Sequence, residues 1–225
     1  DVQKAQAERM MKDKRTSLAV SFFYARALRI DSFLSIVDKD KNLFPEWADG
    51  INSTLHAEAL AFIDDIVNIN AKGLNEILTA PYTFVNAKNA KLYGLNASGD
   101  ELKRVELDPM QRAGFLTQAG FLALNSTRVE TDPIHRGVYT TVNFTCADLV
   151  PPPGTIAQLP TVTAAKTMRE RVEAHTGKGT CGGTCHGAHI NPAGYAFENF
   201  DAAGRWRTKE KGFDINAAAT YNFEF

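Results

Sequence analysis

The sequence predicts an all-α protein, and three observations support this prediction. Residues 3–29 contain neither Gly nor Pro. Apolar residues recur at helical spacing between Leu55 and Ile66. Asp132-Pro133 and Asn191-Pro192 each combine a residue that caps helices with a proline that suits the first helical turn.

Two long helices are expected in the first part of the chain. The first spans Gln3–Arg29, where charged residues dominate as far as Arg15 and an apolar face follows. The second begins close to Pro45, whose fixed φ suits a first turn. It carries the apolar stripe that ends at Ile66, and acidic residues lie on its other faces.

The middle of the chain is expected to be more broken. A short helix is predicted around Leu74–Leu78, then a break at Pro81 and a helical piece at 86–93. The polar stretch 96–108 is a predicted loop with one short extended piece at 102–107. Residues 111–124 predict an apolar helix whose two glycines, Gly114 and Gly120, indicate close packing against another backbone.

The expected domain boundary follows the next helix. That helix begins at Asp132-Pro133 and runs to Cys146, and the prolines of 151–153 prevent its continuation. Residues 150–162 are predicted to be a stiff connector. We therefore expect a helical domain over 1–150 and a small second helical domain over 151–225. The second has a charged helix at 163–176, a short helix after Asn191 and an extended tail from Gly212.

Composition excludes several classes of protein. A net charge of −1 gives no reason to expect nucleic acid or an anionic membrane as a partner. No run of about eighteen apolar residues occurs that would span a bilayer. Three cysteines are an odd number and do not form a complete disulfide framework. No catalytic triad, phosphate loop or pair of carboxylates identifies an enzyme.

The chemistry of the chain is concentrated between Thr180 and Thr208. Cys181, Cys185 and His186 form a Cys-x3-Cys-His pattern. The usual haem-c attachment sequence is Cys-x-x-Cys-His, in which two thiols bind the haem and the histidine ligates iron. Adjacent glycines at 182–183 tolerate backbone conformations that would take up the extra residue. The pattern predicts a variant haem-c site.

Two other interpretations of these residues stay open from the pattern alone. Cys181 and Cys185 would form a disulfide beside a bystander histidine, or a structural zinc ion would bind them together with His175 and His189. Cys146 lies on an apolar stretch and is expected to be a small buried residue.

Several segments of the chain resemble a known family. The chain is similar to large secreted cytochrome-c-like proteins of unknown function that are abundant in planctomycetes. In those proteins a helical domain precedes a haem-c-like domain with Cys-x-x-Cys-His, normally within a longer chain. The matching segments, which cover nearly the whole sequence, are Phe22-Phe23, Leu28-Arg29, Tyr82–Asn86, Leu92–Gly94, Gly114–Gln118, Arg136-Gly137, Pro151–Pro153, Met168–Arg171, His175, Cys185-His186, Asn191-Pro192, Glu198–Asp201 and Gly204–Arg207.

The resemblance implies a covalent haem c held by Cys181, Cys185 and His186, with His186 as the proximal iron ligand. It implies an electron-transfer module in the periplasm or outside the cell, serving a redox partner protein or other domains of a longer chain. Two departures from the family pattern occur. One residue is inserted between the thiols, and Ile190-Asn191-Pro192 stands where the family has Met-Asp-Pro. A haem enzyme with an open sixth iron position is a further alternative.

His175 is the candidate for the sixth iron position. It precedes Cys181 by six residues, and Gly177 and Gly179 make the intervening loop flexible. Its other role would be to stabilise the C-terminus of its helix. Met168, Met110 and His135 are the remaining candidates, and His189 is set aside because it follows His186 too closely.

Overall fold

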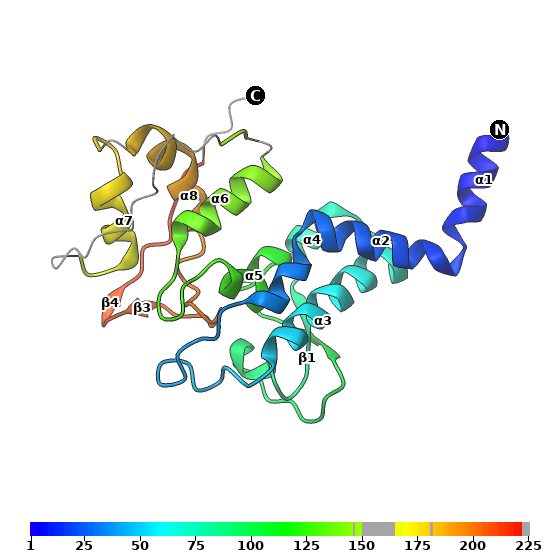
Figure 1. Cartoon of the computed structure of the whole chain (residues 1–225), viewed down its shortest axis with the longest axis horizontal. Coiled ribbons are helices and arrows are strands. Elements are labelled where there is room, and N and C mark those ends of the chain that lie inside the picture. The colour runs from blue at the N-terminus through cyan, green and yellow to red at the C-terminus, as the bar shows by residue number, and fades with distance from the viewer. Residues whose placement is uncertain (146, 150–164, 181, 222–225) are drawn as a thin grey trace. The chain divides into compact units, whose positions relative to one another are not determined.

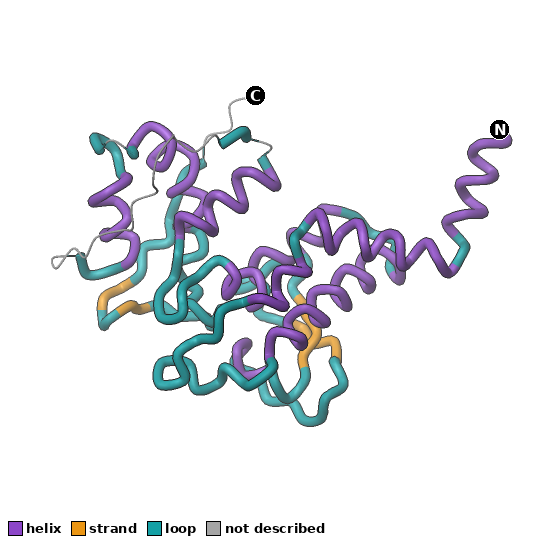
Figure 2. Tube along the Cα trace, in the orientation of Figure 1, coloured by secondary structure: helices purple, strands orange, loops and turns teal. Residues whose placement is uncertain are grey.

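The computed structural model describes residues 1–145, 147–149, 165–180 and 182–221. These residues are mainly helical, as Figure 2 shows. The all-α prediction needs one correction, because two short antiparallel sheets occur as well. β1 (Tyr82–Val85) pairs with β2 (Lys103–Glu106), and β3 (Lys209–Glu210) pairs with β4 (Phe213–Asp214). The extended piece predicted at 102–107 is confirmed as β2.

The chain forms two compact units that are not consecutive in sequence. Unit 1 contains residues 1–36, 48–91 and 95–121, and unit 2 contains 37–47, 92–94 and 122–225. The predicted boundary near residue 150 stays a prediction, since the connector predicted at 150–162 and Cys146 lie outside the described residues.

The single helix predicted over Gln3–Arg29 is wrong in one respect, because two helices occupy this stretch. α1 (Val2–Met11) ends at Lys12, and α2 (Lys14–Ala27) begins after Asp13, whose side chain accepts a hydrogen bond from the Arg15 amide. An N-cap aspartate thus restarts the helix without any Gly or Pro. The 3₁₀ helix η1 (Ile30–Ser35) follows.

The second long helix of unit 1 begins later than predicted. α3 (Ile51–Ile63) starts after Gly50, six residues beyond Pro45, and continues as the π-helix η2 (Asp64–Ile69). Its apolar stripe is confirmed, since Leu55, Phe62 and Ile66 are buried. α2, η1 and α3 lie side by side in this unit (Figure 1).

Unit 1 also buries a polar cluster around Glu58 of α3. The Thr83 hydroxyl on β1 and the Asn89 amide donate to the two oxygens of this carboxylate at 2.5 and 2.8 Å. The Asn89 side-chain oxygen accepts from the Asn86 amide. Burying a carboxylate costs free energy unless it is hydrogen-bonded, so β1 and the turn after it are fixed by this one acid.

Two of the three helical elements predicted between residues 74 and 124 are shorter in the structure than expected. α4 (Leu74–Thr79) confirms the short helix, whereas the predicted piece at 86–93 is reduced to η3 (Ala90–Tyr93). The single helix at 111–124 is wrong: η4 (Phe115–Thr117) and α5 (Ala119–Leu124) replace it. Gly114 has φ 62°, and a Cβ there would lie 2.2 Å from the Leu78 carbonyl carbon. The positive φ interrupts the predicted helix at Gly114, and the predicted close approach to another backbone is confirmed at this glycine.

Unit 2 is built on the contact of α6 (Pro133–Phe144) with α8 (Asn191–Tyr195) (Figure 1). The predicted start of α6 is confirmed, because the Asp132 side chain caps the His135 amide and Pro133 lies in the first turn. A Cβ on Gly194 would lie 1.8 Å from the Pro133 carbonyl oxygen. The two backbones thus touch, and no other residue type fits between them.

The buried side chain of Arg136 holds the segment that follows α8 in place by hydrogen bonds. Arg136 is fully buried, and its guanidinium donates to five oxygens: the carbonyls of Phe197, Phe200, Asp201 and Leu122, and the Ser126 hydroxyl. Glu198, also buried, lies 3.9 Å from Arg136. Burial lowers the pKa of Arg136 to about 10, which leaves the side chain charged at neutral pH.

Residues 37–47 belong to unit 2, and Lys39 anchors them there. Its ammonium is buried and donates to the carbonyls of Ala123, Ser126 and Thr127 at 2.9, 3.3 and 2.9 Å. It also lies over the ring of Trp47. Each of the three ammonium hydrogens therefore has one carbonyl acceptor.

Candidate functional site

The candidate site lies on η5 (Gly183–Ile190), a π-helix that leads directly into α8. Cys185, His186 and His189 all belong to it, whereas Cys181 lies outside the described residues. The Asn191 amide donates to the His186 carbonyl, a bond that spans five residues instead of the four of an α-helix. π-helical turns of this kind occur frequently at functional sites.

Cys185 places an accessible thiol on this helix. The side chain is exposed and is free among the described residues. An exposed thiol beside an imidazole is available for bond formation with a group outside the protein core.

His186, the next residue, is only partly exposed. Its Nδ1 atom is buried and has no hydrogen-bond partner within the described part of the chain. Burial lowers the pKa of His186, because the charged imidazolium loses hydration. The side chain is thereby kept neutral at physiological pH, which is the form that ligates metals.

His175 lies in the last turn of α7 (Met168–Thr176). Its Nε2 atom is likewise buried, with no hydrogen-bond partner among the residues that the structure describes. η5 packs directly on the end of this helix, since a Cβ on Gly183 would lie 2.7 Å from the Gly177 carbonyl oxygen. The helices that carry the two imidazoles are therefore in backbone contact.

The other sixth-ligand candidates have different surroundings. Met110 is 86% exposed in unit 1. His135 is paired with the Asp132 carboxylate at the start of α6. Met168 is buried and packs with Val172 and Tyr195.

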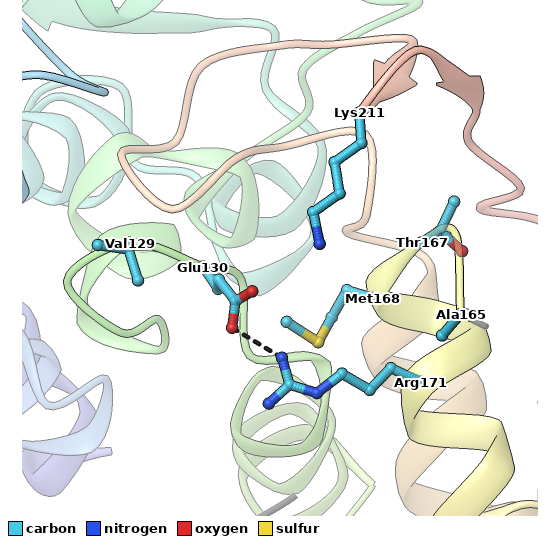
Figure 3. Close-up of a pocket in the computed structure, with 7 residues that line it drawn as sticks. All are labelled: Val129, Glu130, Ala165, Thr167, Met168, Arg171 and Lys211. Carbon is cyan, nitrogen blue, oxygen red and sulfur yellow. Dashed lines mark hydrogen bonds and ion pairs between the residues drawn. The ribbon is translucent and has the colours of Figure 1, made fainter. Parts of the chain in front are cut away.

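Met168 also lines a pocket of about 370 Å³ at the start of α7, with its sulfur facing the space (Figure 3). Arg171 crosses this pocket and donates to Glu130 at 2.8 Å. The Lys211 side chain points into the same space from the turn between β3 and β4 (Figure 3). The sequence had not indicated this pocket, because its residues come from three distant segments.

The arginines around the motif are engaged inside unit 2. Arg205 binds Asp201 and Glu46 at 2.7 and 2.6 Å, and Arg207 donates to the Glu198 carbonyl. The aromatic residues near the motif are core residues: Tyr195, Phe197 and Phe200 are buried, and Trp206 lies edge-on to Phe200.

The predicted capping role of Asn191 is wrong. Asn191 has helical dihedral angles, and its side-chain amide donates to the Thr176 carbonyl and hydroxyl oxygens. Asn191 is the first residue of α8, and its side chain links this helix to the end of α7 instead of capping it.

Within the described residues, no three His, Cys, Asp or Glu side chains gather as a set of metal ligands. Cys181, one ligand of the zinc site that the sequence pattern also allows, lies outside those residues. No described helix is both long enough and apolar enough to cross a membrane.

Two family models match the chain. PSD4, a protein of unknown function (DUF1592), matches residues 1–95, and PSCyt3, a protein of unknown function (DUF1588), matches residues 112–210. The second range contains Cys185, His186 and His175, and its name indicates a planctomycete cytochrome domain. Searches of curated proteins and of solved structures found no match. The chain is thus similar to cytochrome-like proteins of unknown function.

Proposed function

We propose that the C-terminal part of this chain is a c-type haem module that transfers electrons. The observation that carries the proposal is the pair of neighbouring residues on η5. Cys185 offers an exposed thiol, and His186 offers a neutral, partly buried imidazole with an unpartnered nitrogen. The PSCyt3 match over the same residues adds to it.

The donor set fits a covalently attached haem. Cys181 and Cys185 would each form a thioether with the haem, and His186 would ligate the iron as the proximal ligand. On its proximal side the iron needs only one protein nitrogen, from His186. This assignment therefore does not require three ligating side chains to lie together, and no such cluster occurs among the described residues.

The Cys-x3-Cys-His spacing exceeds the usual attachment sequence by one residue. Around that residue the Gly183 amide donates to the Thr180 carbonyl and the His186 amide donates to the Gly182 carbonyl, at 3.0 and 2.9 Å. The five-residue bond from the Asn191 amide to the His186 carbonyl follows the attachment sequence.

His175 is proposed as the distal ligand. Its Nε2 atom is buried without a partner, and its helix contacts η5. A buried imidazole nitrogen without a partner costs free energy, and binding to iron would recover that cost. Two imidazole ligands favour simple electron transfer over chemistry at an open iron position.

Haem supplies one-electron chemistry when bound, and this chain's residues hold it and limit access to it. The redox partner would be another protein or other domains of a longer chain. The similarity to secreted cytochrome-like proteins supports a location in the periplasm or outside the cell. A haem enzyme with an open sixth position is the second candidate, and a wild-type protein with high-spin ferric haem would favour it.

Intact mass and visible absorption test the proposal together. Protein produced in cells that mature c-type cytochromes should be heavier than the polypeptide by about 616 Da, the mass of one haem. It should also show a Soret band. A polypeptide of unmodified mass without that band, with or without bound zinc, would refute the haem assignment.

A further inference from the structure

Asn191, the first residue of α8, is bonded to both segments that carry the candidate iron ligands. Its backbone amide donates to the His186 carbonyl of η5. Its side-chain Nδ2 atom donates to the carbonyl and hydroxyl oxygens of Thr176, at 3.3 and 3.1 Å. Thr176 directly follows His175 at the end of α7. One residue therefore connects His186 to the neighbour of His175.

The groups involved fix the direction of these hydrogen bonds. A backbone carbonyl can only accept, so the Asn191 atom that faces it must be Nδ2 and not Oδ1. The Thr176 hydroxyl donates to the Val172 carbonyl at 2.9 Å, so it accepts from Asn191. The Thr176 carbonyl is also one of the last four of α7, which have no partner within the helix itself. Asn191 supplies the donor that this helix end lacks.

The end of α7 and η5 meet through glycines. A Cβ on Gly182 would lie 3.2 Å from the Thr176 Cα atom, and a Cβ on Gly187 would lie 3.5 Å from the Thr176 carbonyl oxygen. Glycine lets the two backbones approach, but it has no side chain that could interlock with the other segment. Asn191 adds directional bonds to this contact. Because Asn191 is only 2% exposed, these bonds are shielded from solvent.

We propose that Asn191 is a positioning residue of the candidate haem site. It fixes the end of α7, with His175, against η5, with His186, and so sets how the two imidazoles are placed toward each other. The inference rests on the proposed function, in which these two histidines are the axial ligands. It assigns a role to a residue outside the proposed set of attachment residues and ligands.

The first test uses the full chain without haem, so its result does not depend on the proposed function. Asn191→Leu keeps a similar side-chain volume and removes both donor hydrogens. Thr131→Ala is the matched control, because it removes another buried hydrogen bond of unit 2, from Thr131 to Glu198 at 3.1 Å. In Asn191→Leu, hydrogen exchange measured by mass spectrometry should become at least about threefold faster at residues 182–190 than at 133–144. Equal acceleration of the two segments, or none, would overturn the inference.

The second test uses the haem-loaded chain, after intact mass and a Soret band have established attachment in each protein. Asn191→Leu should keep the attached haem, but its ferric form should shift from low-spin toward high-spin. It should also bind azide at least about threefold faster than the wild type. Thr176→Val loses the hydroxyl acceptor and keeps the carbonyl, so it should shift the spectrum less and in the same direction. Thr131→Ala should keep the wild-type spectrum and azide rate.

The outcomes separate this inference from the function on which it rests. A wild-type chain that never acquires haem would refute the proposed function and, with it, a role of Asn191 at an iron. Attached haem with the same spin state and azide rate in wild type and Asn191→Leu would overturn only the role of Asn191. If Asn191→Leu does not fold, an unchanged spin state and azide rate in Thr176→Val would overturn it instead.

Discussion

A methyl group at Gly137 would lie 2.0 Å from the carbonyl oxygen of Ile190. Gly137 belongs to α6, and Ile190 is the last residue of η5. The π-helix that carries Cys185 and His186 is therefore positioned by a glycine more than forty residues earlier in the sequence.

The Gly137→Ala variant should be strongly destabilised. The clash is with backbone, which cannot rotate away, so α6 and η5 must separate at a cost of about 3 kcal/mol or more. Chemical denaturation monitored by circular dichroism measures this loss. Gly73→Ala is the control, because nothing lies within 4 Å of its Cβ position, and it should change stability far less.

The Lys39→Met variant should lose about 2–4 kcal/mol of unfolding free energy, because three buried carbonyls lose their donor. Lys72→Met, on an exposed lysine, is the control.

The same lysine should make stability depend on pH. Burial lowers the pKa of Lys39 to about 7, while the unfolded chain keeps an ordinary value of about 10.4. Between these values the unfolded state binds more protons, so the Lys39 contribution should make unfolding free energy rise with pH. Denaturation of wild type and Lys39→Met from pH 6.5 to 10 should show this rise only in the wild type. Parallel curves would contradict it.

His135 gives a pH dependence of the opposite sign. Its hydrogen bond with Asp132 raises the pKa of His135 above the unfolded value of about 6.5, and burial opposes this only in part. The pair should therefore stabilise the protein fully below pH 6.5 and lose this effect as pH rises through the folded pKa. Because the His135 side chain is 72% exposed, the effect should not exceed about 0.5 kcal/mol. Comparing His135→Gln with wild type between pH 5 and 8.5 measures it.

Haem attachment should respond separately to the thiol and to the imidazole. Cys185→Ala should leave at most one thioether, so denaturation should release haem more readily or the added mass should be lost. His186→Ala should remove proximal ligation and change the absorption spectrum. Wild-type mass and spectrum in both variants would contradict the site. Thr184→Ala, which alters η5 between Gly183 and Cys185, is a control that should keep the haem.

The His175→Ala variant tests the distal position. With two imidazoles the ferric protein should be low-spin, and removal of His175 should make it high-spin and let azide or cyanide bind faster. An unchanged low-spin spectrum would assign the position to another residue, such as Met168 or His135. His56→Ala, in α3 of unit 1, is the matched control.

The parts of the fold that the sequence predicts well depend on local chemistry. Asp132-Pro133 starts α6 because the cap and its amide are three residues apart. Asn191-Pro192 has the same pattern, yet Asn191 is helical, because η5 runs into α8 and Thr176 accepts from the Asn191 amide. Such a partner, fifteen residues away, cannot be inferred from a dipeptide.

The candidate site likewise has features that the local sequence predicts and features that depend on tertiary packing. The Cys185-His186 dipeptide is visible in the sequence because the attachment pattern is short. The buried nitrogens of His175 and His186 depend on how α7 packs on η5. Lys39 is equally unpredictable, since its acceptors lie more than eighty residues away.

Residues 37–47 belong to unit 2 although the chain on both sides of them belongs to unit 1, and this has a consequence for synthesis on the ribosome. Arg205 follows its partner Glu46 by 159 residues, whereas the carbonyls that accept from Lys39 follow that lysine by 84 to 88 residues. At about 5–20 residues per second, synthesis of the stretch from Glu46 to Arg205 takes on the order of 10–30 s. The lysine contacts can therefore form several seconds before the ion pair, so the two ends of this short segment reach their native contacts at different times.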